Sequence, residues 1–126
     1  MLGIGIDIAA VARMGDVLGR HGDRFLERCF RPSEFGLPAG WAHPRPAPQA
    51  VAARWAAKEA FLKALGTDVR GVPYRDIEVV RSARGPVRLV LHGRAAEALA
   101  AVKGGRIHLS FSHERDYAVA TVLIEK

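Results

Sequence analysis

The sequence predicts an α+β fold with a mostly antiparallel sheet and a long buried helix. A strand pattern begins the chain, and a helix that is apolar on most sides follows near its middle. Two further strand patterns end the chain, and the few residues between them favour an antiparallel hairpin. Since a length of 126 residues is typical of one domain, we expect residues 1–126 to form a single unit.

The first expected element is a strand over residues 2–8. Apolar side chains alternate there with small or acidic ones, the period of two that is typical of a half-buried strand. The apolar set is Leu2, Ile4, Ile6 and Ile8, and the intervening set is Gly3, Gly5 and Asp7. Because an aspartate is unfavourable inside a strand, Asp7 is either a functional carboxylate or a cap of the next helix.

The next segment is predicted to be an interrupted helix followed by a loop. Apolar residues recur at helical spacing from Val11 to His21, where the pair His21-Gly22 is expected to end the helix before another turn begins at Phe25. The single cysteine, Cys29, has no disulfide partner in the chain and is expected in the core. The stretch from Pro38 to Pro48 is rich in proline and should be irregular.

The helix predicted from Gln49 to Leu65 is the most informative element. Its apolar face consists of Val51, Trp55, Phe61, Leu62 and Leu65, and its opposite face of Ala53, Ala56, Ala57, Ala60 and Ala64. Ionisable side chains interrupt this helix at Arg54, Lys58, Glu59 and Lys63. Enclosed charges are costly unless they meet opposite charges or a bound ion, so they favour a site. Alternatively, the cations extend to solvent and Glu59 pairs with Lys63.

The remaining elements complete an α+β order. Patterns predict strands at Tyr74 to Arg81 and Val87 to Leu91 around a turn at residues 82–86, and then a short helix from Arg94 to Val102. Alternation around Leu109 and the apolar run from Tyr117 to Ile124 predict the final hairpin.

Charge and hydropathy indicate which partners the protein can have. A net charge of +6 at pH 7 favours anionic partners, which are nucleic acid, phosphates or an acidic protein. Arg13, Arg20 and Arg24 would share one face of a continuous helix, either as a solvated face or as a docking surface. The chain has no apolar run of membrane-spanning length and no basic segment of the secretory kind, so we expect a cytoplasmic protein without a membrane partner.

Asp7 and Glu59 are candidate ligands of Mg²⁺. Carboxylates together with substrate phosphate oxygens and water are its usual ligands, and nearby lysines would neutralise the remaining phosphate charge. His113, near the tip of the predicted hairpin, is either structural or functional. The chain has neither a P-loop nor a dinucleotide-binding glycine motif, so any nucleotide is bound in another way. This constellation suggests phosphoryl chemistry.

Motifs spread over nearly the whole chain resemble holo-acyl-carrier-protein synthase, the short, single-domain type of 4'-phosphopantetheinyl transferase. They are Gly5-Ile6-Asp7 with Arg13, Arg54-Trp55-Ala56-Ala57-Lys58-Glu59-Ala60-Phe61, Lys63-Ala64-Leu65-Gly66-Thr67, Asp76-Ile77-Glu78 and Ser110-Phe111-Ser112-His113-Glu114. The resemblance implies the fold of that family. It also implies that coenzyme A donates its phosphopantetheine arm to a serine of apo acyl carrier protein, with Mg²⁺ required and adenosine 3',5'-bisphosphate released.

The resemblance also assigns roles by position around the phosphates. Asp7 and Glu59 match the family's metal ligands. Lys58 and Lys63 match residues near the pyrophosphate, where Lys63 would stabilise or protonate the leaving phosphate. Asp7, Glu59 and Lys63 are therefore the expected catalytic residues.

Further positions match contacts to the nucleotide and to the partner. Arg54 and His113 match positions near the ribose 3'-phosphate, and Gly85 and Pro86 lie in a turn implied to contact adenine. In that turn the family usually has glycine before a basic residue, whereas here Arg84 comes first. The resemblance further implies a homotrimer with coenzyme A between subunits and an acidic carrier protein docked on Arg13, Arg20 and Arg24.

Two functions of other classes compete with this interpretation. A small basic nucleic-acid-binding module without catalytic activity accounts for the net charge and the arginines. It gives no reason for Asp7 or Glu59, because carboxylates repel phosphates in the absence of a metal. A catalytically silent carrier-binding subunit is the other alternative, which the intact motifs disfavour. We therefore expect a transferase with no nucleic-acid partner, acting in fatty-acid biosynthesis or in a polyketide pathway.

Overall fold

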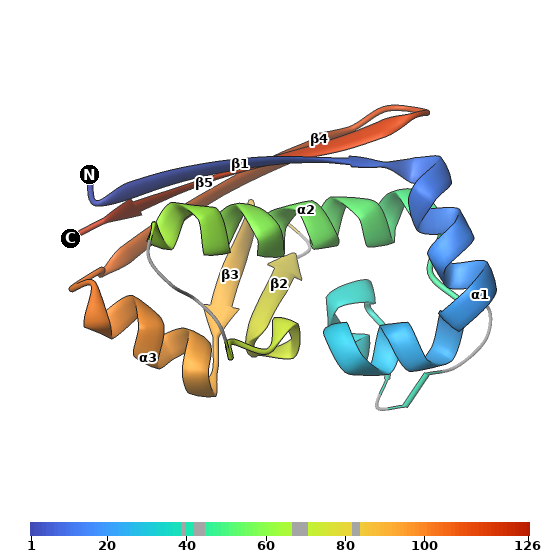
Figure 1. The fold of residues 1–126 in the computed structure, drawn as a ribbon, viewed down its shortest axis with the longest axis horizontal. Coiled ribbons are helices and arrows are strands. Elements are labelled where there is room, and N and C mark those ends of the chain that lie inside the picture. The colour runs from blue at the N-terminus through green and yellow to red at the C-terminus, as the bar shows by residue number, and fades with distance from the viewer. Residues whose placement is uncertain (39, 42–44, 67–70, 82–83) are drawn as a thin grey trace.

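The computed structural model describes residues 1–38, 40–41, 45–66, 71–81 and 84–126. Strands and helices follow one another in the α+β order that the sequence predicts (Figure 1). The elements are β1 (Gly3–Ala10), α1 (Val11–Cys29), the 3₁₀ turn η1 (Pro32–Phe35), α2 (Pro48–Leu65), the 3₁₀ turn η2 (Tyr74–Asp76), β2 (Ile77–Arg81), β3 (Val87–Leu91), α3 (Gly93–Ala101), β4 (Arg106–His113) and β5 (Tyr117–Glu125).

The sheets are antiparallel and lie on either side of α2. In the described residues, β1, β5 and β4 form a three-stranded sheet in that order, and β2 pairs with β3 in a separate two-stranded sheet. Figure 1 shows α2 lying along the larger sheet, with β2 and β3 on the far side of the helix. The predicted terminal hairpin is confirmed as β4 and β5. The edges of the larger sheet are β1 and β4, so residues on these two strands are separated by the central strand, β5.

Helix α2 is enclosed as its composition predicts. The alanines of its small-residue face are all buried, and so are Val51, Phe61 and Leu65. The helix begins at Pro48, where the missing N–H is not needed, and is followed by Gly66 in a left-handed conformation with φ 70°. No helix in the described residues is long and apolar enough to span a membrane.

Strand β1 buries the face that carries its glycines. The alternating pattern favours burial of the isoleucine face instead. A Cβ atom added to Gly3 or Gly5 would collide with backbone oxygens of α2, so the absence of side chains lets strand and helix touch directly. The opposite face carries Ile4, Ile6 and Ile8, which are 58%, 61% and 63% exposed. An apolar stripe thus remains uncovered on the outside of the sheet.

Helix α1 is continuous, so the expected break at His21-Gly22 is wrong. Gly22 is buried inside the helix, and the guanidinium of Arg45 lies in the space that a side chain would occupy. Arg45 donates hydrogen bonds to the Leu18 carbonyl oxygen at 3.0 Å and to Asp23 at 3.1 Å. The glycine is therefore a packing contact rather than a helix end. Cys29 is buried at the end of α1, as expected.

Smaller differences concern the ends of elements. The segment Tyr74–Asp76 forms a 3₁₀ turn instead of the start of a strand, which begins only at Ile77. Helix α3 spans Gly93–Ala101, one residue earlier than the sequence suggests. Residues 82–83 of the predicted β2–β3 turn, together with residues 39 and 42–44 of the proline-rich stretch, lie outside the described residues.

Candidate active site

A cavity of about 630 Å³ lies between β1, α1 and α2. Asp7 reaches it from β1, Arg13 from α1, and Glu59 and Lys63 from α2. Trp55, Phe25 and Tyr117 contribute apolar wall. The structure therefore brings together the predicted carboxylates and one of the predicted lysines, from segments far apart in the sequence.

Asp7 is held by Lys63 within this cavity. The ammonium Nζ of Lys63 lies 2.9 Å from Asp7 Oδ1 and donates to the carbonyl oxygen of Ile6 at 3.1 Å. The capping alternative for Asp7 is wrong, because it lies within β1 and the residue before α1 is Ala10, which has no side-chain cap. The alternative Glu59–Lys63 pair is also wrong in the part of the chain that the structure describes, since Lys63 pairs with Asp7.

Glu59 is bound by a residue that the sequence analysis did not single out. The hydroxyl of Tyr74 donates a hydrogen bond of 3.0 Å to Glu59 Oε1. Burial, the hydrogen bond to Glu59 and the negative charges of Glu59 and Asp7 raise the pKa of Tyr74 to about 12. The phenol therefore stays protonated, and remains a donor, throughout the physiological pH range.

The donor set fits a magnesium ion that also binds a phosphorylated substrate. Asp7 and Glu59 supply hard oxygen ligands from a rigid strand and a rigid helix. The residues that the structure describes contain no cluster of three or more His, Cys, Asp or Glu that would complete a metal cage. Mg²⁺ is commonly bound by one or two carboxylates plus phosphate oxygens and water, so this incomplete set suits it.

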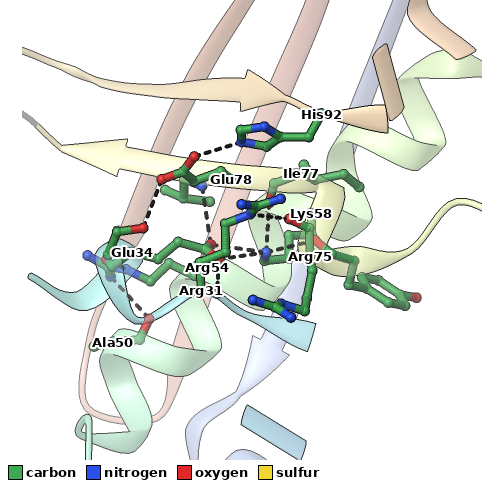
Figure 2. Close-up of polar contacts among 12 residues, drawn as sticks. Arg31, Glu34, Ala50, Arg54, Lys58, Arg75, Ile77, Glu78 and His92 are labelled. Carbon is green, nitrogen blue, oxygen red and sulfur yellow. Dashed lines mark hydrogen bonds and ion pairs between the residues drawn. The ribbon is translucent and has the colours of Figure 1, made fainter. Parts of the chain in front are cut away.

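Lys58 does not line the cavity and lies in a buried network of polar contacts (Figure 2). Its Nζ atom is 3.0 Å from Glu34 Oε1 and donates to the carbonyl oxygens of Ile77 at 2.6 Å and Tyr74 at 2.9 Å. Glu34 also accepts from the backbone N–H groups of Arg31 at 2.8 Å and Val79 at 3.2 Å. The side chains of Lys58 and Glu34 are both 0% exposed.

Burial acts on the two charges of this network in opposite directions. Desolvation raises the pKa of Glu34, while Lys58 and the backbone donors oppose that shift. Desolvation lowers the pKa of Lys58, while Glu34 opposes it. The proposed pyrophosphate contact of Lys58 is therefore not supported, because all its described polar partners are protein atoms away from the cavity. The alternative that Lys58 extends to solvent is wrong as well.

Arg54 belongs to a second group, near the β4 edge. It donates to the carbonyl oxygens of Glu34 at 2.8 Å and Ala50 at 3.1 Å, and its guanidinium lies 5.7 Å from the centre of the Phe111 ring. The guanidinium of Arg81 lies 5.6 Å from the same ring. Burial and the neighbouring Arg81 lower the pKa of Arg54. Two cations thus converge on one aromatic ring of β4.

The other predicted nucleotide residues also lie away from the carboxylate cavity. His113 ends β4 and is exposed, and strand alternation gives it the same side of the sheet as Phe111. Gly85 and Pro86 lie between β2 and β3, just after the residues that are not described. The carboxylates and Lys63 therefore lie toward the β1 edge of the sheet, whereas His113 lies on β4 and Arg54 lies beside Phe111 of that strand.

The predicted docking arginines share one continuous helix. Arg13 lines the cavity, and Arg20 and Arg24 are exposed further along α1. With steps of seven and four residues, helical geometry places them in one row. The row begins at the cavity and extends away from it.

Known proteins match this chain over nearly its full length. Residues 3–122 match the model of the 4'-phosphopantetheinyl transferase superfamily. The chain belongs to this superfamily. A relative from Koribacter versatilis, named holo-[acyl-carrier-protein] synthase, is 45% identical over 126 residues, which cover 99% of this chain and 98% of the relative. The one from Gloeobacter violaceus is 46% identical, covering 96% of this chain and 90% of that protein.

Solved structures of this superfamily have the same fold. The holo-[acyl-carrier-protein] synthase of Neisseria meningitidis matches with a TM-score of 0.85 and 31% identity, covering 100% of this chain and 99% of that chain. The Helicobacter pylori synthase, solved in complex with coenzyme A, matches with a TM-score of 0.78 and 27% identity, covering 97% and 99%. The predicted resemblance, the α+β fold and the assignment as a phosphopantetheinyl transferase are confirmed. The non-catalytic nucleic-acid-binding alternative has no support in these matches.

Proposed function

We propose that this phosphopantetheinyl transferase moves the 4'-phosphopantetheine arm of coenzyme A to a serine of apo acyl carrier protein and releases adenosine 3',5'-bisphosphate. The reaction would require Mg²⁺ and serve fatty-acid biosynthesis in the cytoplasm. The observation that carries the proposal is the pair of carboxylates, Asp7 and Glu59, lining one cavity beside the Lys63 ammonium. Residues 1–126 would form one catalytic domain.

The residues of the cavity have distinct roles in this proposal. Asp7 and Glu59 would hold Mg²⁺, which when bound supplies positive charge to the pyrophosphate oxygens. The Lys63 side chain is 54% exposed, so its ammonium can contact a ligand phosphate where water lies otherwise. It would stabilise the negative charge that develops on the leaving phosphate. Holding donor and acceptor in line would supply much of the rest of the rate.

The nucleotide end of coenzyme A would be bound by the other group of residues. Arg54 and His113 would face the 3'-phosphate, with Gly85 and Pro86 near adenine. One ligand would lie between two subunits of a homotrimer, as the family resemblance implies, with this group supplied by one subunit and Asp7 by the other. The exposed isoleucines of β1 supply an apolar surface for such an assembly. The coenzyme A complex of the Helicobacter pylori relative supports the choice of donor.

The arginine row of α1 would dock the carrier protein. Arg13, Arg20 and Arg24 form a positive stripe that starts at the cavity and would attract an acidic surface. Replacing all three with glutamate should raise the KM for carrier protein by about tenfold or more, while the KM for coenzyme A changes little. Steady-state kinetics at two salt concentrations measures both constants. A lost coenzyme A affinity with an unchanged carrier KM would contradict this docking surface.

The main experiment follows the mass of apo carrier protein incubated with coenzyme A and Mg²⁺. The wild-type chain should add phosphopantetheine, and Glu59→Gln should abolish the transfer while retaining the fold, since it keeps the shape and removes the charge. Full activity of Glu59→Gln would contradict the metal assignment.

The shared site is tested by mixing inactive Glu59→Gln with inactive His113→Ala. Hybrid assemblies contain some sites with both native residues, so part of the activity should return. Subunit exchange is verified separately by mass spectrometry of the mixed assemblies. Proven exchange without any recovery would place both residues in the site of one chain.

A further inference from the structure

We propose that Tyr74 is a positioning residue whose hydroxyl fixes the Glu59 carboxylate for metal binding. The inference rests on the proposed function, because it needs Glu59 to be a metal ligand. Its basis is the hydrogen bond of 3.0 Å from the Tyr74 hydroxyl to Glu59 Oε1, at the wall of the cavity that Asp7 also lines. Carboxylates that bind metals are themselves commonly held by hydrogen bonds from outer residues.

Three residues of α2 hold Tyr74 at three different points. The ring stacks on Trp55, with centroids 4.6 Å apart and planes at 22°. The carbonyl oxygen accepts a hydrogen bond of 2.9 Å from Lys58 Nζ, and the hydroxyl donates to Glu59. Residues three and four apart face the same side of a helix, so Trp55, Lys58 and Glu59 form one surface against which Tyr74 lies. The 3₁₀ turn η2 is thereby fixed to the helix at the level of the active site.

The hydroxyl of Tyr74 contributes a directed hydrogen bond to Glu59, which is separate from the packing of the ring. The stacking on Trp55 would persist with a phenylalanine, whereas the directed hydrogen bond would not. An ionised carboxylate only accepts hydrogen bonds, so the phenol must be the donor. Binding one oxygen of a flexible glutamate restricts its rotamers before any ligand arrives.

The buried pair of Lys58 and Glu34 acquires a role through this arrangement. Lys58 is fixed by Glu34 and by the Ile77 carbonyl oxygen, so its contact with the Tyr74 backbone is also fixed. The network connects η1 and β2 to the residue that orients Glu59. A lysine in the middle of the central helix therefore serves the site by supporting Tyr74 rather than by touching phosphate.

The test compares Tyr74→Phe with Ser33→Ala. The first removes only the hydroxyl and keeps the stacked ring. The second removes a hydroxyl that donates to a different carboxylate, Glu78 Oε2 at 2.9 Å, outside the cavity. Mn²⁺ binding in the presence of coenzyme A is measured by electron paramagnetic resonance, and Mg²⁺ dependence is measured by steady-state transfer.

Tyr74→Phe should raise the Kd for Mn²⁺ and the apparent constant for Mg²⁺ about tenfold, the lower end of what outer residues of metal sites contribute. Its kcat at saturating Mg²⁺ should stay within about twofold of wild type, because the ligands themselves remain. Ser33→Ala should change neither constant.

The outcomes separate the inference from the proposed function. An unchanged Mn²⁺ affinity in Tyr74→Phe, together with a lost affinity in Glu59→Gln, would overturn the role of Tyr74 and leave the function intact. An unchanged affinity and full transfer in Glu59→Gln would overturn the metal assignment and the inference with it.

Discussion

Two lysines of α2 form ion pairs of nearly equal length in very different surroundings. Lys58 Nζ lies 3.0 Å from Glu34, and both side chains are 0% exposed. Lys63 Nζ lies 2.9 Å from Asp7, but the lysine side chain is 54% exposed. In the buried pair each charge depends on its partner, because neither side chain is accessible to solvent water. In the open pair, water or a phosphate can take the place of either partner.

The difference teaches that distance alone does not identify a functional charge. Both lysines occur in the motif that carries the family resemblance, yet only Lys63 lines the cavity. The Lys58 pair holds η1, η2 and β2 together, whereas the Lys63 pair leaves the lysine side chain partly exposed at the cavity. Substitution of each lysine should therefore damage a different property.

The largest effect on stability is expected for Lys58→Met. The substitution keeps most of the side-chain volume but leaves Glu34 buried without its partner, which typically costs about 3–5 kcal/mol. The free energy of unfolding from urea denaturation measures the loss. The double variant Lys58→Met with Glu34→Gln removes both charges and should recover at least half of it. A loss in the single variant below about 1 kcal/mol would show that the two charges do not depend on each other.

A smaller effect on stability and a large one on catalysis are expected for Lys63→Ala. Removing one partner of a half-exposed pair should change the free energy of unfolding by less than about 1 kcal/mol. The kcat/KM of transfer should fall by about 10²–10³-fold, the usual range for removal of one group that stabilises transition-state charge. Lys63→Arg, which keeps the charge, should retain part of the activity. Near wild-type activity in Lys63→Ala would contradict the contrast between the two lysines.

Local patterns in the sequence were sufficient to predict most of the elements. Gly66 ends α2 through a backbone property that acts within a few residues, and the short connection before Tyr117 determines the final hairpin. The proline-rich pattern places Pro48 in the irregular stretch, whereas it is the first residue of α2. The continuity of α1 was not predicted, because Gly22 favours a helix end by sequence, whereas in the structure it makes room for Arg45 from a distant segment. The exposed face of β1 was also unpredictable, since alternation shows that two faces differ but not which one meets α2.

The candidate site was predicted only in part, because some of its contacts join segments that are distant in the sequence. Residue type and motif were enough to name Asp7, Glu59 and Lys63, which the structure brings to one cavity. They were not enough for Lys58, whose environment is set by Glu34 from a distant segment. They also missed Tyr74, because its hydroxyl reaches Glu59 only once η2 packs on α2. A prediction from one sequence cannot see such long-range contacts.

The direct backbone contact between β1 and α2 determines how this enzyme can be re-engineered. Gly5 precedes Asp7 on the strand and lies against the carbonyl oxygen of Ala60, which follows Glu59 on the helix. The spacing between β1 and α2, the two elements that carry the carboxylates, is thus set by a main-chain contact rather than by adaptable side chains. Libraries can vary the exposed positions of α1 and β4, whereas a side chain at Gly5 would collide with the carbonyl oxygen of Ala60 and push the strand away from the helix.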